Sequence, residues 1–326
     1  MRLDIKINHD IERRSSFARN LHRWLNQRTL PGYMLNRLQW SWYPRLFLER
    51  HYPIHVDIEL SSRCNLKCPM CFREHREIPI QKNMDFELFK KIIDEIEGKV
   101  FSVKFTGRGE PQMNKHFPKY MEYMKGKKFG EVAMITNGQM MTEDKMRAII
   151  DCGMDFVIFS IDGLKETYER IRVPGKYEDI IEKVARLHAI RTEMGATKPM
   201  IRIQSVMIPE AEQAEFYRIW EPISDDILFL HFKDYASDAE NKQIENYPCP
   251  MPFQRMMIHH NGIVPMCIND EYEMAVQGDL RTRSVLEVWK GEQYRATREI
   301  HECGKRTEKY ANCAKCPLTR VGHGDE

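Results

Sequence analysis

Three cysteines in the first quarter of the chain have a spacing that suits an iron–sulfur cluster. Cys64, Cys68 and Cys71 form the pattern C-x3-C-x2-C within the segment SSRCNLKCPMCF. Such clusters normally take four cysteine ligands, so a set of three leaves one iron open for a small molecule. A structural zinc site is the alternative, but zinc is closed by four protein ligands, and His75 would have to be the fourth.

Four more cysteines near the C-terminus form a second set. Cys249 and Cys267 have seventeen residues between them, and Cys313 and Cys316 follow as a C-x2-C pair. Four thiolates satisfy a closed iron–sulfur cluster, and they also satisfy a zinc ribbon. The residues alone leave both alternatives open, but neither leaves a coordination position for a substrate.

The remaining cysteines and the N-terminus indicate the compartment that we expect. Cys152 follows a helical pattern and should be a buried thiol, whereas Cys303 lies in a polar stretch and could be reactive. The N-terminal sequence MRLDIKINHDIERR contains no apolar signal segment. No run approaches the roughly 18–20 apolar residues of a membrane span. We therefore expect a cytoplasmic protein, in which clustered thiols bind metal or do chemistry rather than form disulfides.

The elements that must position the first cysteine set follow an alternating pattern. The β-rich runs are His55–Leu60, Val100–Phe105, Glu131–Ile135, Phe156–Ser160, Met200–Val206 and Ile227–Phe232, and the helical patterns between them include Asp85–Ile96, Glu143–Ile150 and Tyr177–Glu193. A strand–helix unit repeated about six times predicts an α/β fold with a parallel sheet. Six units are fewer than the eight of a complete TIM barrel, so residues 55–235 should form a partial (βα)6 TIM-like barrel. Its site should lie at the carboxyl ends of the strands.

Two flanking regions differ from this barrel. Residues 1–54 are a basic, Trp-rich extension: between residues 11 and 50 there are eight arginines, no lysine and two acidic residues. Phe17, Leu21 and Trp24 recur at helical spacing and predict a short amphipathic helix. Such an extension either packs on the barrel or contacts a membrane surface or an acidic partner.

Residues 236–326 should form a small C-terminal cysteine-rich domain. Pro, Cys and Gly are frequent there, and a region so poor in regular apolar pattern often needs a metal to fold. We expect two short strands, Met256–His259 and Gly262–Met266, around a turn at Asn261-Gly262. Ser284–Tyr294 should be a short helix.

The first cysteine set, placed directly after the first strand of a βα barrel, resembles the radical S-adenosylmethionine (SAM) superfamily. Met70, the apolar residue before the third cysteine, also fits. The resemblance implies that Cys64, Cys68 and Cys71 hold a 4Fe-4S cluster whose open iron binds SAM. In that family an electron from the cluster cleaves SAM to a 5′-deoxyadenosyl radical, which abstracts a hydrogen atom.

Further segments at the expected strand ends are similar to motifs of the same family. Arg108-Gly109-Glu110 stands in place of a Gly-Gly-Glu motif and departs from it at Arg108. By this resemblance Gly109 allows close backbone approach and Glu110 accepts a hydrogen bond from the SAM ammonium. The other residues that it assigns to SAM are Asn137, the ribose-contacting pair Ser160 and Asp162, Arg172 at the SAM carboxylate, and Gln204 at the adenosyl group.

The second cysteine set, with Gly262 between its first two members, resembles the SPASM/twitch extension of radical SAM enzymes. A full SPASM domain holds two auxiliary clusters and needs further cysteines after the last pair. The twitch version holds one, so Cys249, Cys267, Cys313 and Cys316 should bind a second, auxiliary 4Fe-4S cluster. The spacing is similar in particular to that of a 2-deoxy-scyllo-inosamine dehydrogenase.

These resemblances predict a radical SAM oxidoreductase. Hydrogen-atom abstraction, followed by loss of an electron to the auxiliary cluster and of a proton, would complete a two-electron oxidation of a small polar alcohol such as a sugar or aminocyclitol. The alternatives are modification of a ribosomally made peptide, and radical epimerisation with Cys303 as hydrogen donor. A metal-stapled binding protein is the non-enzymatic alternative.

The oxidation also implies a base and partners. Asp270, three residues after Cys267, is the candidate base, with Glu271 and Asp238 as substitutes; a loop-capping role for Asp270 is the alternative. An electron donor such as flavodoxin or ferredoxin is expected. The chain has 50 basic and 48 acidic residues, a net charge of +2, so we expect no specific nucleic-acid binding.

Overall fold

A parallel sheet forms the core of the protein. The structure is a computed structural model, and it describes residues 30–316 except residues 76–77, 79–81, 207, 231–246 and 248. The strands are β1 (His55–Ile58), β2 (Ser102–Phe105), β3 (Glu131–Thr136), β4 (Phe156–Ser160), β5 (Met200–Ser205), β6 (Asp226–Phe229) and β7 (Arg255–Ile258). They pair in the order β6-β5-β4-β3-β2-β1-β7, and each neighbouring pair is parallel. The partial barrel that the alternating pattern predicts is confirmed.

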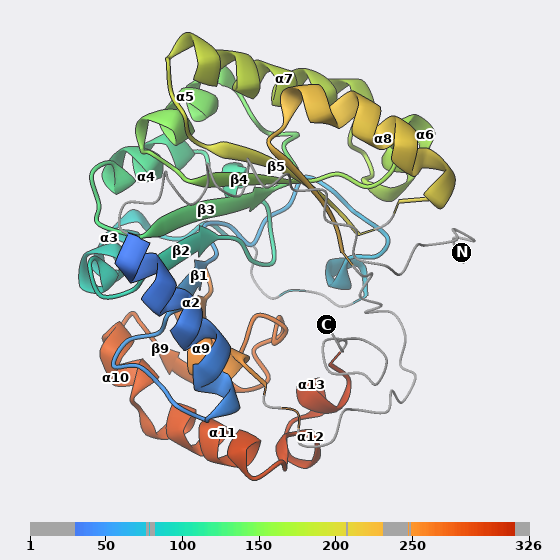
Figure 1. Cartoon of the computed structure of the whole chain (residues 1–326). Coiled ribbons are helices and arrows are strands. Elements are labelled where there is room, and N and C mark those ends of the chain that lie inside the picture. The colour runs from blue at the N-terminus through green and yellow to red at the C-terminus, as the bar shows by residue number, and fades with distance from the viewer. Residues whose placement is uncertain are drawn as a thin grey trace.

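Helices lie along the outer side of this sheet, as Figure 1 shows for α4, α5, α7 and α8. Within the described residues they are α3 (Phe86–Ile96), α4 (Phe117–Met124), α5 (Glu143–Asp151), α6 (Lys165–Ile171), α7 (Tyr177–Glu193) and α8 (Gln213–Trp220), with short 3-10 turns at η1 (Phe72–Glu74), η2 (Pro111–Met113), η3 (Glu210–Glu212) and η4 (Glu221–Ile223). The start of α3 shows how the sequence sets a boundary. The Asp85 carboxylate accepts hydrogen bonds from the amides of Glu87 and Leu88, at 2.9 and 3.2 Å, which satisfies two otherwise unpaired donors.

The seventh strand corrects one prediction. We expected residues 256–266 to form a hairpin, and the turn does form, with Gly262 at φ +83°. However, β7 pairs with β1, and the next strand pairs elsewhere. That second, antiparallel pair consists of β8 (Ile263–Pro265) and β9 (Val276–Asp279). Without β7, β1 would be an open edge, and the apolar β7 is suited to burial on both faces. The sheet therefore extends past residue 235, where we expected the C-terminal domain to begin.

The C-terminal part packs its helices below the sheet in the view of Figure 1. They are α9 (Met251–Gln254), α10 (Val285–Trp289), α11 (Glu292–Glu302), α12 (Arg306–Lys309) and α13 (Ala311–Ala314). The single helix expected at Ser284–Tyr294 is two helices. Ser284 does begin the first one, through reciprocal capping bonds with Glu287. A Cβ at Gly291 would lie 2.8 Å from the Glu287 carbonyl oxygen. The helix is therefore interrupted at glycine, which has no Cβ atom.

One helix, α2 (Leu30–Arg45), precedes the sheet. Pro31 lies in its first turn, where the missing N–H costs no helical hydrogen bond. The side-chain amide of Gln254 donates to the carbonyl oxygen of Trp40, which ties α2 to the C-terminal part. The amphipathic helix expected around Leu21 lies outside the described residues. Among the helices that are described, none has the length and apolar character needed to cross a bilayer.

Candidate functional site

The first cysteine set opens into a cavity at the carboxyl ends of the strands. The cavity has a volume of about 330 Å³ and is lined by segments that follow β1 to β5. All three cysteines line it, as do seven of the eight predicted cofactor contacts: Met70, Gly109, Glu110, Asn137, Ser160, Arg172 and Gln204. The structure thus brings together residues that are up to 140 positions apart in the sequence (Cys64 and Gln204). We call this space the barrel cavity.

Glu110 is held rigidly against the cysteine loop. Its buried carboxylate accepts hydrogen bonds from the Thr136 hydroxyl at 2.7 Å and from the Asn137 amide at 2.8 Å. Its own amide donates to the Arg63 carbonyl oxygen at 2.8 Å. A Cβ on Gly109 would lie 2.3 Å from that same oxygen, so this approach requires glycine. Burial raises the pKa of Glu110, and a cationic ligand group would offset that burial.

Asp162 does not line the barrel cavity, which corrects its predicted contact with ribose. Its Oδ2 atom accepts from Nε of Arg172 at 2.7 Å. Its Oδ1 atom accepts from the Val206 amide at 2.7 Å and the Ser205 hydroxyl at 3.1 Å. Both oxygens are therefore occupied by protein groups, and Asp162 instead fixes the direction of Arg172, which does line the cavity.

Two polar side chains of the barrel lie close to two of the three thiols. Nδ2 of Asn137 lies 3.8 Å from Cys64 Sγ, and Nη1 of Arg172 lies 3.9 Å from Cys68 Sγ. Burial raises the pKa of Cys64 to about 11 and also raises the pKa of Cys68 and Cys71. Such donors stabilise the thiolate form that a metal requires.

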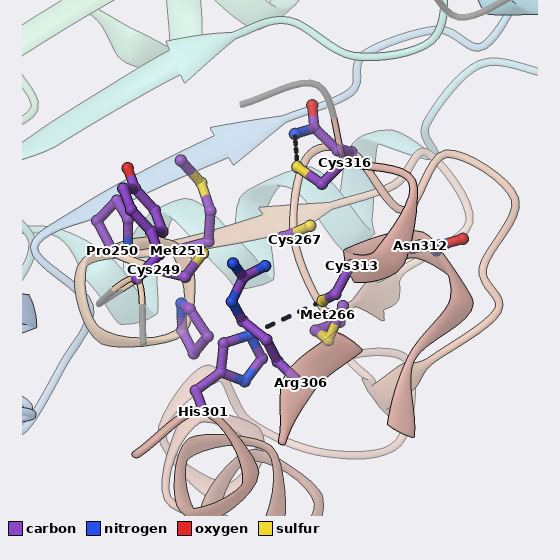
Figure 2. Close-up of a pocket in the computed structure, with 13 residues that line it drawn as sticks. Cys249, Pro250, Met251, Met266, Cys267, His301, Arg306, Asn312, Cys313 and Cys316 are labelled. Atoms are coloured by element: carbon purple, nitrogen blue, oxygen red, sulfur yellow. Dashed lines mark hydrogen bonds between the residues drawn. The ribbon is translucent and has the colours of Figure 1, made fainter. Parts of the chain in front are cut away.

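The second cysteine set surrounds a separate cavity of about 160 Å³, which we call the auxiliary cavity. Figure 2 shows its four cysteines, which come from the segment before α9, the loop after β8, helix α13 and the residues just beyond it. Pro250, Met251 and Met266 contribute apolar walls. Nδ2 of Asn269 donates to Cys316 Sγ at 3.6 Å, and Nε2 of His301 lies 3.9 Å from Cys313 Sγ.

Both sets share one property. Within the described part of the chain, no three His, Cys, Asp or Glu side chains converge on a point where one metal ion would be held. The thiols of each set are instead distributed around a cavity. His75, the possible fourth zinc ligand of the first set, is exposed and does not line the barrel cavity.

Asp270 organises the loop that follows Cys267. Its carboxylate accepts from the amides of Met274 at 2.9 Å and Ala275 at 3.0 Å, and also from the side-chain amide of Asn312. The residue is completely buried and lines neither cavity. This geometry corrects our candidate base: Asp270 has the loop-capping role that was the alternative. Of its substitutes, Glu271 is also buried and Asp238 lies outside the described residues.

The same loop joins the two cysteine sites. The Tyr272 hydroxyl donates to the carbonyl oxygen of Phe72 at 2.9 Å, and the two rings are 6.2 Å apart. Phe72 directly follows Cys71, so a contact from the auxiliary side reaches the first cysteine loop. Glu273, which has a φ of +58°, accepts from Arg108 at 3.0 Å and contacts His259 at 2.8 Å.

Arg108 explains the departure from the Gly-Gly-Glu pattern, and sequence reasoning missed its role. Its Nε and Nη2 atoms each donate to the Glu59 carboxylate at 2.9 Å, while its Nη1 atom reaches Glu273. His260 Nδ1 also contacts Glu59, at 2.8 Å. Burial alone would raise the pKa of Glu59, but the hydrogen bonds from His260 and Arg108 hold it well below its usual range. The guanidinium therefore links the barrel to the C-terminal part.

The two other cysteines take different places. Cys152 is buried, as predicted, and its thiol donates to the Ile149 carbonyl oxygen at 3.1 Å. Cys303 is exposed at the C-terminal end of α11 and lines neither cavity. That position gives no support to its predicted role as a hydrogen donor.

Two family models match the chain. The model of the radical SAM superfamily matches residues 58–201, and the model of SPASM, an iron–sulfur cluster-binding domain, matches residues 249–317. The chain therefore contains a radical SAM domain and a C-terminal SPASM domain. The first domain implies SAM and a 4Fe-4S cluster as cofactors, and the second implies additional iron–sulfur clusters.

The chain is similar in sequence to curated proteins whose names describe different activities. The chain is 32% identical to the tungsten-containing aldehyde ferredoxin oxidoreductase cofactor-modifying protein of Pyrococcus furiosus, over 48% of this chain and 44% of that protein. It is 31% identical to the Fe-coproporphyrin III synthase of Methanosarcina barkeri, over 35% of this chain and 28% of that protein. It is 33% identical to the antilisterial bacteriocin subtilosin biosynthesis protein AlbA of Bacillus subtilis, over 30% of this chain and 21% of that protein. The chain thus spans less than half the length of these curated relatives.

Solved structures share the fold. BtrN in complex with AdoMet and 2-DOIA aligns with a TM-score of 0.55 at 15% identity, over 82% of this chain and 93% of that chain. Streptococcus suis SuiB bound to precursor peptide SuiA aligns with a TM-score of 0.60 at 14% identity, over 92% of this chain and 81% of that chain. At these identities the likeness is one of fold alone.

Proposed function

We propose that this chain is a radical SAM oxidoreductase that oxidises an alcohol group of a small polar molecule, such as a sugar or aminocyclitol, by two electrons. The observation that carries the proposal is the division of seven cysteines between two cavities. Three thiols face a larger space lined by both polar and apolar side chains, and four thiols face a smaller space with mostly apolar walls. Thiols distributed in this way suit clusters of several irons better than single zinc ions.

The donor sets fit the cofactors that the family implies. Cys64, Cys68 and Cys71 would hold the SAM-binding cluster, and the four thiols of the auxiliary cavity would hold a second cluster. When bound there, the two clusters and SAM supply a 5′-deoxyadenosyl radical and a place for the second electron of the oxidation. An external electron donor such as flavodoxin or ferredoxin would provide the first electron.

The protein's own residues would orient these groups. Glu110, rigid and desolvated, would accept a hydrogen bond from the SAM ammonium. Arg172, fixed by Asp162, would bind the SAM carboxylate. Ser160 and Gln204 line the same cavity and would contact the nucleoside.

A proton acceptor is also required, because oxidising an alcohol to a carbonyl releases a proton. Among the residues that the structure describes, the carboxylates of Glu110 and Glu74 line the barrel cavity. The Glu110 oxygens already accept three hydrogen bonds, from Thr136, Gln112 and Asn137. Glu74 is exposed at η1, close to the cysteine loop, and we assign it the role first given to Asp270.

A small substrate is favoured over a large one by the available space. The barrel cavity, about 330 Å³, is at the lower end of the usual range for small-molecule sites, roughly 300–1,000 Å³, and SAM would occupy part of it. The spacing of the second cysteine set, similar to that of a 2-deoxy-scyllo-inosamine dehydrogenase, supports the same choice. The fold shared with BtrN, which was solved with 2-DOIA, is consistent with it.

Modification of a ribosomally made peptide is the second candidate. The observation that favours it is the fold likeness to SuiB, which was solved with a precursor peptide and aligns over 92% of this chain. Radical epimerisation needs a hydrogen donor in the barrel cavity, and the exposed position of Cys303 does not favour it.

Labelled substrates distinguish these candidates. The anaerobically reconstituted, reduced protein should be incubated with SAM and a panel of deuterated aminocyclitols, sugars and peptides. We expect deuterium from an alcohol carbon in 5′-deoxyadenosine, and a carbonyl product two mass units lighter than the unlabelled substrate. An isomeric product, or label drawn only from peptides, would contradict the proposal.

Substitution of Glu74 tests the assignment of the proton acceptor. Glu74→Gln should still form 5′-deoxyadenosine but should lower the rate of product formation by about 10²- to 10⁴-fold, the usual contribution of a general base. Glu166→Gln, which changes another glutamate at the start of α6, is the matched control. Unchanged product formation in Glu74→Gln would assign the proton to another acceptor.

A further inference from the structure

Helix α2 and the residues after it carry an exposed apolar surface. It consists of Met34, Leu35, Leu38, Trp42, Leu46 and Leu48, whose exposed fractions range from 48% to 56%. We call this set the α2 surface. Met34, Leu38 and Trp42 follow each other at i, i+4 spacing and therefore lie on one side of the helix. Large apolar side chains gathered in this way mark an interaction site more often than isolated ones do.

The opposite side of α2 is already occupied. Trp40 packs edge-on against His55 at a centroid distance of 6.0 Å, and the Arg255 guanidinium lies 4.7 Å from the same ring. Asn36 and Pro44 are buried. The helix is thus anchored by one face, and the α2 surface is directed away from the rest of the described chain.

The charged side chains of α2 itself are all positive. Arg37 and Arg45 are exposed, and their guanidinium groups lie 5.6 Å from the Trp40 ring and 5.9 Å from the Trp42 ring. The sequence from residue 13 to residue 48 contains no Asp or Glu. Since the whole chain has a net charge of only +2, the positive excess is local to this region.

From this combination we infer that the α2 surface docks on an anionic lipid bilayer. Leucine, methionine and tryptophan side chains can enter the boundary between headgroups and acyl chains, and arginines beside them contact anionic headgroups. A second copy of the chain is a poorer occupant, because a two-fold contact would bring arginines against arginines. A bilayer requires no matching shape.

The location of the surface is compatible with activity on a membrane. Trp40 contacts His55, the first residue of β1, whereas the first cysteine set follows the carboxyl end of that strand. The α2 surface therefore lies near the end of β1 opposite to the barrel cavity. Docking there would leave the cavity open to substrate, and it places the surface away from the cysteine loop that an electron donor must approach.

Vesicle co-sedimentation of the full, cluster-loaded chain tests this inference. The probes are vesicles of phosphatidylcholine alone and vesicles with about 30% phosphatidylserine. We expect sedimentation with the anionic vesicles, little with the neutral ones, and weaker binding at high salt because screening shortens the reach of the charges. No sedimentation with either, or equal sedimentation with both, would overturn the inference.

Variants separate the apolar and the charged contributions. Leu38→Ser/Trp42→Ser should reduce vesicle binding to background, and Arg37→Gln/Arg45→Gln should weaken it by about fivefold per arginine. Arg218→Gln and Met194→Ser, which change exposed residues of α8 and the end of α7, are the matched controls and should bind as the wild type does. Circular dichroism and iron content verify that each variant is folded.

Size-exclusion chromatography with light scattering distinguishes the other occupants. The inference expects a monomer whose mass is unchanged by Leu38→Ser/Trp42→Ser. A dimer that this variant dissociates would assign the α2 surface to a second copy of the chain and overturn the lipid assignment. Vesicle binding that survives the double substitution would likewise overturn it.

Discussion

The two cysteine sites of this molecule differ in how the chain assembles them. The first takes its three thiols from eight consecutive residues, which line the barrel cavity together with polar and apolar side chains. The second takes four thiols from segments 67 residues apart, Cys249 to Cys316, and encloses them with Pro250, Met251 and Met266. A local loop leaves one side free for a ligand, whereas a site built from distant segments closes on itself. Under the proposed function, that difference separates the reaction site from the electron-transfer site.

The two sites are nevertheless mechanically joined. Arg108 binds Glu59 of the barrel and Glu273 of the auxiliary side, and Tyr272 contacts the residue after Cys71. These contacts of Arg108 and Tyr272 form one buried polar junction between the two sites. We expect the substitutions below to disturb the two sites to different extents.

The largest effect on stability is expected at this junction. Arg108→Ala removes the guanidinium from the buried Glu59 carboxylate, which keeps His260 and the backbone amide of residue 108 as hydrogen-bond partners. Breaking a buried ion pair typically costs about 3–5 kcal/mol of unfolding free energy. Glu273→Gln, at a side chain that is 24% exposed, should cost about 1 kcal/mol. Anaerobic urea denaturation measures both. A result in which the two variants are equally mild would remove Arg108 as the link between the sites.

A smaller effect, confined to the barrel cavity, is expected from Asp162→Asn. An asparagine cannot hold Arg172 as a carboxylate does, so SAM should bind about 10- to 100-fold more weakly, as when an outer partner of a ligand is lost. Equilibrium dialysis with labelled SAM measures this. Asp226→Asn breaks a similar buried pair with Arg202 at the start of the edge strand β6, and it should leave SAM binding intact. Equal losses in both variants would indicate a general destabilisation instead.

The auxiliary side should respond to Asp270→Asn with a loss of stability only. Replacing one carboxylate oxygen by an amide group leaves a buried backbone amide unpaired, which costs roughly 1–2 kcal/mol. The melting temperature should fall, while the pH profile of product formation should keep its shape. A profile that loses its acidic limb in this variant would restore Asp270 as the proton acceptor, because a general base must be deprotonated to act.

The smallest effect concerns the thiols that belong to neither site. In the cluster-loaded protein, iodoacetamide should modify Cys303 first because it is exposed. Burial raises the pKa of Cys152 to about 12 and shields it, so it should react only on unfolding. Mass spectrometry of digested protein measures the order. Cys303→Ser should leave SAM cleavage and product formation unchanged, and a changed product in that variant would favour epimerisation.

The sequence was sufficient to predict the parts of the fold that have a local cause. The bounds of α7 and β4 follow from apolar period alone, and C-x3-C-x2-C is a signal contained in one loop. The pairing of β7 was not predicted, because which edge accepts a strand depends on the assembled sheet and not on the strand itself. The break at Gly291 was missed for a similar reason, since an apolar period continues across it.

Residue roles were harder to predict than residue neighbourhoods. Seven of eight expected cofactor contacts do line the barrel cavity, because strand ends meet at one edge of a parallel sheet. Asp162 and Asp270 were given contacts with ligands, yet both are occupied by backbone amides or by arginine and asparagine side chains. A carboxylate near a cofactor motif has no sequence feature that distinguishes these two uses. Arg108 was noted only as a departure from a motif, since its partners Glu59 and Glu273 come from distant segments.

Iron content, measured together with SAM cleavage in two cysteine variants, tests the central claim most directly. The wild type should contain about eight irons per chain, the content of two 4Fe-4S clusters. Cys64→Ala/Cys68→Ala/Cys71→Ala should retain about four irons and form no 5′-deoxyadenosine. Cys249→Ala/Cys267→Ala/Cys313→Ala/Cys316→Ala should also retain about four, and it should cleave SAM without forming oxidised product. SAM cleavage by the first variant, or zinc in place of iron in that same variant, would contradict the account.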